Sequence, residues 1–583
     1  MIHYDVPCRL RDGTVLRADV ARPAGDGRWP VILTRTPYGK AYAPGVTTDL
    51  THGARHGFVT IIQDVRGRGA SDGQGDFRPW VQEGADGAES VEWAAGLPYS
   101  SGEVFMTGPS YLGFVQWAAA AEGPSSLRGI NPIVSVGQFR RSVMYCGGVH
   151  ELELNGAWWT MMGLEAIARR DWDSPSLMQH AFGQAAAAFD ALGREHGYDS
   201  LPLSRFEPVA SSVLGKGFFD ILKEGETGPS IAASTKANGY ENIFVPALIV
   251  AGWYDVFIRA SIDQFVGMRT RGGNAETRRK TRLIVGPWAH HSQGNMTGER
   301  VSPGPAAIQT FNAFGLMGLA AEYFRELKQG GSEQAPVKIW VMGADLWRDE
   351  WEWPMERTVV TPWYLSSGGR ANSSRGDGVI SPIRRSGAPD GFIYDPASPV
   401  PTRGGAVAGV TCAQGGSDCR VLEEREDILV YKSDILQENI EVTGTPVVEL
   451  WITTDVVDTD FVARLVDVHP DGTARLITDG IIRARYRDNP DGFEAAAPLE
   501  PGRPYLVRIE LLPTSNLFKP GHRLQIDITS SCFPRWARNL NIWDEWEGAL
   551  ADAKVAHQKI LHEEEHASRV LLPVVPACNR ELC

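Results

Sequence analysis

The segment around Ser110 constrains the fold more than any other part of this 583-residue chain. Residues 103–113 read Glu-Val-Phe-Met-Thr-Gly-Pro-Ser-Tyr-Leu-Gly: an apolar run of strand length, one serine beside small residues, and the start of a helical pattern. A strand–turn–helix of this kind exposes the serine Oγ at the top of a sheet and points free helix N–H groups at developing negative charge. The match to G-x-S-x-G is imperfect, because Leu112 occupies the second small position and Gly113 follows it. On this motif alone, an ordinary serine in a strand–helix turn is the alternative.

Strand and helix signals alternate over the first 140 residues. Short apolar runs have the length of strands, and the stretches between them have helical character. Alternation of this kind favours a mostly parallel sheet with helices on both faces. The expected strands are 31–35, 58–63 and 104–107, and the expected helices are 81–95 and 112–122.

The strand pattern stops between residues 141 and 242. Within that stretch, 152–169 and 175–194 are expected to be helices. Strand signals return at 245–252 and 283–286. One sheet domain interrupted by a helical insertion explains this order better than a row of separate domains.

From about residue 353 the composition changes. Ser, Gly, Pro and Asn cluster, and short strand signals then recur between turns with few helix signals. The 63 glycines and 37 prolines of the chain fit the many turns that such a fold needs. Regular short strands are typical of a β-sandwich of the jelly-roll type. The expected strands include 447–453, 461–468, 506–511 and 524–528.

Two further residues follow buried-strand signals in the order of a serine hydrolase triad. Asp255 comes just after the run at 245–252, and His290 comes just after the run at 283–286. The order Ser, acid, His is that of the α/β-hydrolase fold, and open α/β sheets place their sites at the carboxyl ends of strands. For each residue taken alone, the simpler interpretation is a turn carboxylate for Asp255 and a packed surface histidine for His290. In combination they favour a triad with Ser110, and the adjacent His291 is an alternative base that spacing does not exclude.

We therefore predict an α/β fold in two domains. The α/β-hydrolase domain consists of residues 1–140 and 243–352, and a helical cap is inserted at 141–242. A jelly-roll β-sandwich domain occupies residues 353–583.

Several other motifs belong to one family pattern. They are Arg9-Leu-Arg-Asp-Gly13, Arg35-Thr-Pro-Tyr38, Asp64-Val-Arg-Gly-Arg-Gly69, Gly252-Trp-Tyr-Asp255, Gly286-Pro-Trp-Ala-His290, Val466-Asp-Val-His-Pro-Asp-Gly472 and Pro520-Gly-His-Arg523. From about residue 3 to about residue 575 the chain resembles the family of bacterial cocaine esterase and, more widely, the X-prolyl dipeptidyl-peptidase and α-amino-acid ester hydrolase group. Ser-Tyr-x-Gly is that family's own form of the elbow, which accounts for the imperfect motif.

This resemblance implies roles for five residues. Ser110 is the nucleophile, Asp255 the acid and His290 the base. The oxyanion hole is formed by the backbone N–H of Tyr111 and the hydroxyl of Tyr38. A preorganised donor of this kind lowers the barrier by about 3–4 kcal/mol. The implied reaction passes through an acyl-enzyme and needs no cofactor.

The resemblance also suggests what the acyl pocket accepts. Amino-ester hydrolases of the group carry an acidic residue beside the elbow, where this chain has Leu112, so an ammonium pocket is not evident. Phe257 and Trp158, with Trp159 beside it, match aromatic acyl-pocket positions, and Met144 stands at a third. We expect an ester with an aromatic or apolar acyl group. Core packing within the cap is the alternative for Trp158 and Trp159.

Three other functions compete with the esterase prediction. An X-Pro dipeptidyl-peptidase or an α-amino-acid ester or β-lactam acyl hydrolase would use the same triad. A catalytically inactive carbohydrate-binding protein would use the jelly roll instead. A zinc metalloprotease is the last alternative, because His562-Glu-Glu-Glu-His566 fits the H-E-x-x-H pattern. The strand-like run and Pro573 that follow disfavour the helix that this pattern needs. No metal site is predicted.

Charge and cysteine usage limit the partners and the location. The net charge of −14 disfavours nucleic acid and anionic membranes. None of the seven cysteines forms a C-x-x-C pair, and Cys412 with Cys419 is the one bridge considered. The chain has no apolar leader and no apolar run of the ~20 residues that a transmembrane helix needs. We expect a cytoplasmic enzyme whose partner is a small-molecule ester, with a homodimer left open.

Overall fold

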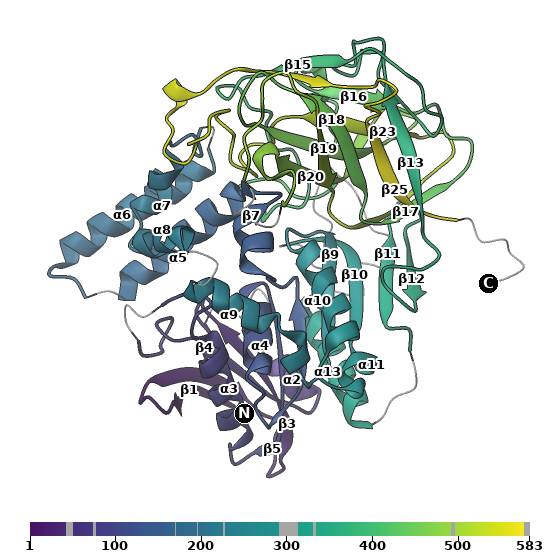
Figure 1. The fold of residues 1–583 in the computed structure, drawn as a ribbon. Helices are drawn as coiled ribbons and strands as arrows, with labels where there is room; N and C mark the ends of the chain where they lie inside the picture. The colour runs from purple at the N-terminus through teal and green to yellow at the C-terminus, as the bar shows by residue number, and fades with distance from the viewer. Residues whose placement is uncertain are drawn as a thin grey trace, which may run out of the picture.

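The computed structural model describes residues 1–41, 50–73, 77–169, 171–194, 196–224, 228–290, 313–329, 334–490 and 496–576. Figure 1 shows an α/β layer at the bottom, a β-sandwich at the top, and a group of helices that projects beside them. Among the described residues, no helix combines the length and the apolar composition that crossing a membrane requires.

The α/β layer is built on one ten-stranded sheet. Neighbouring strands from β4 to β11 run parallel, and β1, β2 and β12 are antiparallel additions at the two edges. The predicted, mostly parallel sheet is confirmed. The strands, in sheet order, are β1 (Ile2–Arg9), β2 (Val15–Ala21), β4 (Val59–Asp64), β3 (Trp29–Thr36), β5 (Ser100–Pro109), β6 (Leu127–Ile133), β9 (Leu248–Tyr254), β10 (Arg282–Ala289), β11 (Val337–Val341) and β12 (Leu346–Glu350).

Side-chain alternation explains why helices cover both faces of this sheet. In β3, Val31 and Leu33 belong to one apolar core and Ile32 to another. The first core includes α3 (Glu83–Ala95), α4 (Tyr111–Ala121) and α10 (Ile258–Arg271), and the second includes α13 (Ala313–Gln329). Because successive side chains of a strand point to opposite faces, an all-apolar strand must be covered twice.

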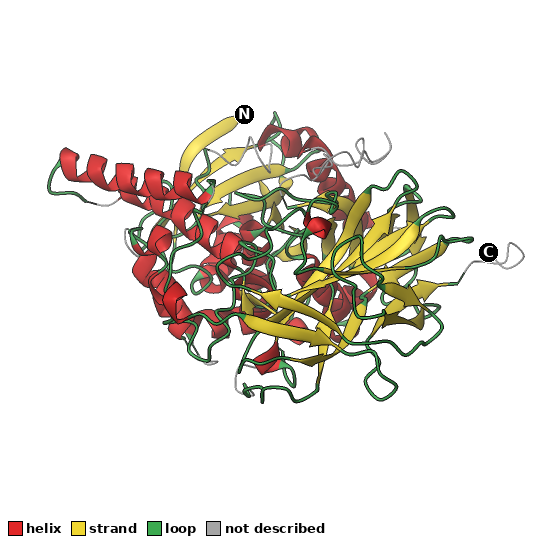
Figure 2. Cartoon of the chain, turned by 90° about the horizontal axis from the view of Figure 1, so that it is seen from above, coloured by secondary structure: helices red, strands yellow, loops and turns green. Residues whose placement is uncertain are grey.

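The cap lies between β6 and β9 in the chain. Its long helix α5 (Leu152–Arg169) has the bounds expected from the sequence. Figure 2 shows the cap helices projecting from one side of the molecule, away from the strands of the β-sandwich. The other elements are η1 (Phe139–Met144), β7 (Tyr145–Cys146), β8 (Val149–His150), α6 (Pro175–Leu192), α7 (Glu207–Ala210), α8 (Gly215–Lys223) and α9 (Pro229–Ala237).

The C-terminal part is a sandwich of short and mostly antiparallel strands, as predicted for a jelly roll. Its strands are β13 (Val359–Ser366), β14 (Val379–Ser381), β15 (Asp390–Tyr394), β16 (Leu429–Lys432), β17 (Ile440–Gly444), β18 (Val447–Thr453), β19 (Asp460–Val468), β20 (Ala474–Arg483), β21 (Tyr505–Glu510), β22 (Thr514–Phe518), β23 (Arg523–Thr529), β24 (Ala556–Ile560) and β25 (Arg569–Val575). Cys412 and Cys419 are both free thiols, so the bridge considered between them is not formed.

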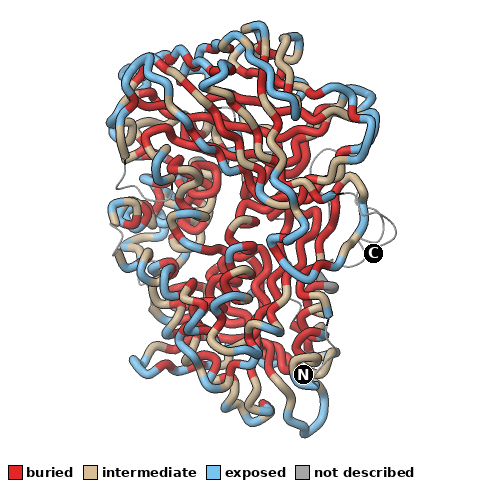
Figure 3. Tube along the Cα trace, turned by 45° about the vertical axis from the view of Figure 1, so that its right-hand side comes forward, coloured by how far each residue is buried: buried red, intermediate tan, exposed pale blue. Residues whose placement is uncertain are grey.

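Polar contacts tie the sandwich to both other parts. The Tyr254 hydroxyl, at the end of β9, donates to the Leu476 carbonyl at 3.0 Å. Glu153 of α5 accepts the backbone N–H groups of Val410 and Thr411 at 3.1 and 3.0 Å. Figure 3 shows buried backbone running through the sheet and the sandwich, with exposed turns at the periphery. The jelly roll therefore braces the strand end that precedes Asp255.

Candidate active site

Ser110 stands at a sharp turn between β5 and α4. Its backbone has φ 58° and ψ −122°, in a region that residues other than glycine rarely adopt. Gly108 has φ 148°, and a Cβ there would lie 2.6 Å from the Leu112 Cβ. A Cβ on Gly113 would lie 2.7 Å from the Ser135 Cβ. The turn thus needs glycine on both sides of the serine, which is the pattern of a nucleophile elbow.

A hydrogen-bonded chain joins Ser110 to His290 and Asp255. The Ser110 Oγ lies 3.0 Å from the His290 Nε2, and the His290 Nδ1 lies 2.7 Å from the Asp255 Oδ1. Asp255 and His290 follow β9 and β10, which are parallel neighbours, so their side chains emerge at the same edge of the sheet. Asp255 is fully buried, and the His290 imidazole contacts one of its two carboxylate oxygens. The alternative base His291 lies outside the described residues.

The Tyr38 hydroxyl meets this chain from the loop after β3. It accepts the Trp158 Nε1–H at 3.1 Å and is hydrogen-bonded to the Ser110 side chain. Burial raises the pKa of Tyr38, and the hydrogen bonds with Trp158 and Ser110 oppose that rise. The phenol is therefore protonated at neutral pH and can donate to an oxygen bound at Ser110.

Tyr111 has its hydroxyl bonded to groups outside the triad. It is the first residue of α4, so its N–H has no partner within the helix. Its hydroxyl donates to the Glu83 Oε1 at 2.9 Å and accepts a hydrogen bond from the backbone N–H of Trp80 at 3.0 Å. Burial and the neighbouring Glu83 charge raise the pKa of Tyr111 well above its usual range. The side chain is an anchor that fixes the position of the first helical turn.

The structure separates the predicted pocket residues into two groups. The Phe257 ring contacts the His290 ring edge-on, with centroids 5.2 Å apart, and the Trp158 ring reaches Tyr38. Trp159 is 1% exposed and packs on Phe218 at 5.5 Å, inside the cap. Leu112 is buried under the elbow, and Met144 is buried at the end of η1.

Sequence reasoning missed two residues that support the Tyr38 loop. Arg68 is buried; it donates to the Pro37 carbonyl at 2.8 Å and pairs with Glu165 of α5 at 2.6 Å. Trp80, with φ 70°, lies between the Phe139 and Trp158 rings at 4.6 and 5.5 Å. Arg68 belongs to the 64–69 motif, but neither local pattern nor spacing indicates which carbonyl it reaches.

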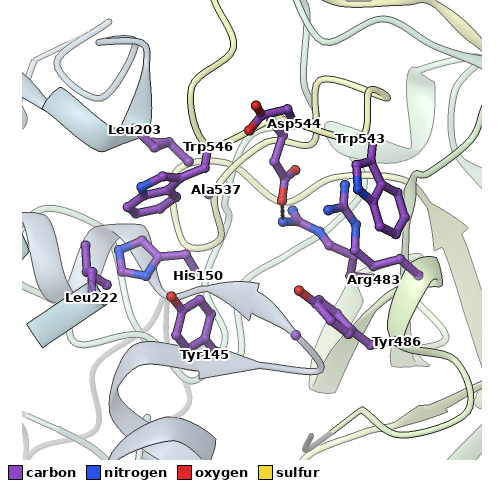
Figure 4. Close-up of a pocket in the computed structure, with 13 residues that line it drawn as sticks. Tyr145, His150, Leu203, Leu222, Arg483, Tyr486, Ala537, Trp543, Asp544 and Trp546 are labelled. Atoms are coloured by element: carbon purple, nitrogen blue, oxygen red, sulfur yellow. Dashed lines mark hydrogen bonds and ion pairs between the residues drawn. The ribbon is translucent and has the colours of Figure 1, made fainter. Parts of the chain in front are cut away.

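A cavity of about 500 Å³ lies between the cap and the jelly roll (Figure 4). His150 of β8 forms one wall, and burial lowers the pKa of His150 to about 4. None of the predicted site residues lines this cavity. It is lined by Tyr145, Gly148, His150, Leu203, Leu222, Arg483, Arg485, Tyr486, Ala537, Trp543, Asp544, Glu545 and Trp546.

The H-E-x-x-H segment does not form the helix that a zinc site of that type requires. Residues 562–566 lie in bends and loop before β25. His562 is buried, and its Nε2 lies 2.8 Å from the Asp390 Oδ2. The His566 ring packs against Trp451 at 4.6 Å. The two imidazoles are therefore engaged with different partners.

Comparison with known proteins finds matches along most of the chain. The model of the X-Pro dipeptidyl-peptidase (S15 family) matches residues 12–292, and that of the X-Pro dipeptidyl-peptidase C-terminal non-catalytic domain matches residues 330–571. The chain is 34% identical to cocaine esterase of Rhodococcus sp. (strain MB1 Bresler), over 97% of each protein.

Solved structures share the whole architecture. An aminopeptidase from a marine sediment Thaumarchaeota archaeon superposes with a TM-score of 0.78 at 21% identity, over 99% of this chain and 96% of that one. An α-amino-acid ester hydrolase gives 0.74 at 22%, over 98% and 96%. A CocE/NonD family hydrolase from Staphylococcus aureus gives 0.66 at 17%, over 99% and 93%. At these identities the likeness establishes a common fold and not a common substrate.

Proposed function

We propose that this chain, which belongs to the X-Pro dipeptidyl-peptidase (S15) family together with cocaine esterase, cleaves carboxylic esters through an acyl-enzyme on Ser110. The chain is a serine ester hydrolase. The observation that carries the finer proposal is the hydrogen-bonded chain from Ser110 through His290 to Asp255, beneath the Tyr38 hydroxyl.

The first half of the proposed reaction forms the acyl-enzyme. The His290 Nε2 takes the Ser110 proton while Oγ bonds to the carbonyl carbon. The π electrons move to the carbonyl oxygen, which receives hydrogen bonds from the Tyr38 hydroxyl and the Tyr111 N–H. Asp255 holds the imidazole orientation and stabilises the imidazolium. The tetrahedral intermediate then expels the alcohol, which leaves with the proton held by His290.

The second half returns the enzyme to its starting state. His290 removes a proton from water as the water oxygen bonds to the acyl carbon. The carboxylic acid leaves when the bond to Oγ breaks, and Ser110 regains the proton from His290. The cycle consumes one ester and one water, and every proton transfer uses the same imidazole, so the proposed reaction uses no cofactor.

Side-chain chemistry around the site supports an aromatic or apolar acyl group. Phe257 and Trp158 present rings beside the triad. Two carboxylates of α5 are already engaged, since Glu153 accepts backbone N–H groups of the jelly roll and Glu165 pairs with Arg68. These contacts give neither carboxylate to a substrate ammonium. The cytoplasmic location and a small-molecule ester as partner belong to the same proposal.

Turnover of three substrates tests this specificity. We expect kcat/KM for methyl benzoate to exceed that for a phenylglycine methyl ester at least about tenfold, since the two share a leaving group and a charged ammonium loses more on burial than an aryl ring. A glycyl-prolyl p-nitroanilide is expected to be hydrolysed more slowly still. Comparable or faster turnover of either amine-bearing substrate would favour an amino-ester hydrolase or an X-Pro peptidase instead.

A further inference from the structure

Three side chains with metal-binding atoms meet at one end of β19, in the jelly roll. Asp467 lies near the end of the strand, His469 follows it, and His522 precedes β23. β19 and β23 are antiparallel neighbours, with Val468 opposite Arg523, so the strand ladder holds all three side chains together. One carboxylate oxygen and one nitrogen from each imidazole lie within 4.8 Å of one another.

Hydrogen bonding explains only part of this arrangement. The Asp467 Oδ1 lies 2.8 Å from the His522 Nδ1, which is a hydrogen bond. The Asp467 Oδ2 lies 3.8 Å from the His469 Nε2, which is too long for one. Two ligands on a tetrahedral zinc ion, with bonds of about 2.1 Å, stand about 3.4 Å apart. The first separation is about 0.6 Å shorter and the second about 0.4 Å longer than that value, so modest side-chain shifts would bring the donors to an ion.

The backbone fixes the three residues, and solvent reaches them. The His469 N–H donates to the Thr473 carbonyl at 2.8 Å, and the His522 N–H donates to the Lys519 carbonyl at 3.1 Å, so each histidine is tied into a tight turn. The Asp467 side chain is 4% exposed, whereas the imidazoles of His469 and His522 are 26% and 12% exposed. An ion would thus enter from solvent and keep water at its open positions.

We propose that Asp467, His469 and His522 bind one divalent transition-metal ion of the zinc type. Two imidazoles and one carboxylate form a donor set typical of Zn²⁺, whereas Mg²⁺ and Ca²⁺ prefer oxygen ligands. Arg475 is the cross-strand neighbour of Asp467, and Arg523 follows His522; both are nearby positive charges that binding must overcome. The ion joins the turn after β19 to the turn before β23. It takes no part in the proposed ester hydrolysis, which uses other residues.

Zinc titration of the purified full-length chain tests this site. Calorimetry with ZnCl₂ is compared for the wild type, His469→Ala, His522→Ala and the control His557→Ala. His557 is also paired with an aspartate, Asp455, at 2.7 Å, but is far more exposed. We expect one zinc equivalent to be lost, or weakened at least about tenfold, in the first two variants and kept in the control. Hydrolysis of p-nitrophenyl benzoate reports folding of each variant.

His469→Ala is the decisive variant, because its side chain lies at a solvent-facing turn and its removal leaves β19 and β23 intact. Co²⁺ substitution adds a visible spectrum that reports nitrogen ligands, so binding elsewhere on the chain is distinguished. A wild type that takes up no zinc beyond the amount bound by folded His469→Ala overturns the proposal.

Discussion

Trp158 of the cap donates its Nε1–H to the Tyr38 hydroxyl at 3.1 Å, although the two residues are 120 positions apart in the chain. The bond occupies a lone pair of the phenol oxygen and leaves the hydroxyl proton for Ser110 and, in the proposed reaction, for an oxyanion bound there. In the proposed reaction, a single indole N–H of the helical insertion therefore orients the donor that the sheet domain supplies.

Replacing that indole separates orientation from donation. Tyr38→Phe removes the proposed oxyanion donor, and we expect kcat for an aryl ester to fall about 10²–10³-fold. Trp158→Phe keeps an aromatic ring but releases the phenol, and a smaller fall of about fivefold to fiftyfold is expected, with KM changed less. Trp172→Phe is the matched control, because its Nε1 bonds the Ile167 carbonyl within the cap. Wild-type kcat in Trp158→Phe would show that Tyr38 needs no such orientation.

Tyr111→Phe tests whether backbone or hydroxyl serves the site. The hydroxyl is bonded to buried Glu83, so its loss leaves a carboxylate short of a donor and is expected to cost about 1–3 kcal/mol of unfolding free energy. We expect kcat to change less than about tenfold, because the N–H remains. Chemical denaturation and steady-state kinetics measure the two effects. A loss of kcat as large as that of Tyr38→Phe, without loss of stability, would place the hydroxyl in the reaction.

The glycine before the elbow has a steric test. Gly108→Ala forces a Cβ to 2.6 Å from the Leu112 Cβ, and we expect a loss of about 2–4 kcal/mol in stability together with a large fall in kcat. Gly123→Ala is the control, since Gly123 also has a positive φ, of 68°, but nothing lies within 4 Å of its Cβ position. That control substitution should lower the free energy of unfolding by only about 1–2 kcal/mol. Equal effects of the two substitutions would mean that backbone conformation alone, and not crowding at the elbow, sets the requirement.

His150 gives the fold a predictable acid sensitivity. Burial lowers the pKa of His150 to about 4, from an ordinary value of 6.5, while a hydrogen bond from its ring to the Met144 backbone opposes the shift and the charge of Arg483 adds to it. The unfolded state then binds the proton at higher pH than the folded state. The contribution of His150 to stability is present above pH about 6.5 and is lost as pH falls through about 4, by about 2 kcal/mol between pH 7 and 4.5.

The neighbouring Glu151 changes the pH dependence of stability in the opposite direction. Burial raises the pKa of Glu151 to about 7, so its contribution is present below its ordinary pKa of 4.5 and is lost as pH rises through 7. Urea unfolding of His150→Asn from pH 7.5 to 4.5 isolates the histidine, and we expect the variant to lose less stability in acid than the wild type. His180→Asn, on the exposed face of α6, should follow the wild type. Parallel curves for His150→Asn and the wild type would contradict the assignment.

Local pattern was enough for five strands of the α/β sheet, and β6, between β5 and β9, was not among them. β3, β4, β5, β9 and β10 are buried on both faces, so their apolar runs are read directly from the residues. The edge strand β1 was not predicted, because most of its side chains are exposed and carry no such pattern. Strand ends also indicated Ser110, Asp255 and His290, since parallel neighbours open at one edge of the sheet. The predicted domain limits stay predictions.

Residues that act across the fold were beyond sequence reasoning. Arg68 reaches the Pro37 carbonyl, and Trp80 packs between rings from η1 and α5; both contacts depend on how the cap sits on the sheet. Adjacent Trp158 and Trp159 share a motif but lie about a quarter turn apart on α5. One therefore reaches Tyr38 while the other enters the cap core. Helix orientation, which no local pattern specifies, separates them.

Covalent labelling tests the nucleophile most directly. Reaction of the wild type with a fluorophosphonate, followed by peptide mass spectrometry, should place one phosphonyl group per chain on Ser110. Ser110→Ala should take up no label, and its kcat/KM for p-nitrophenyl benzoate should fall at least about 10⁴-fold. Label on another residue, or an unlabelled wild type that still hydrolyses the ester, would contradict the proposed mechanism.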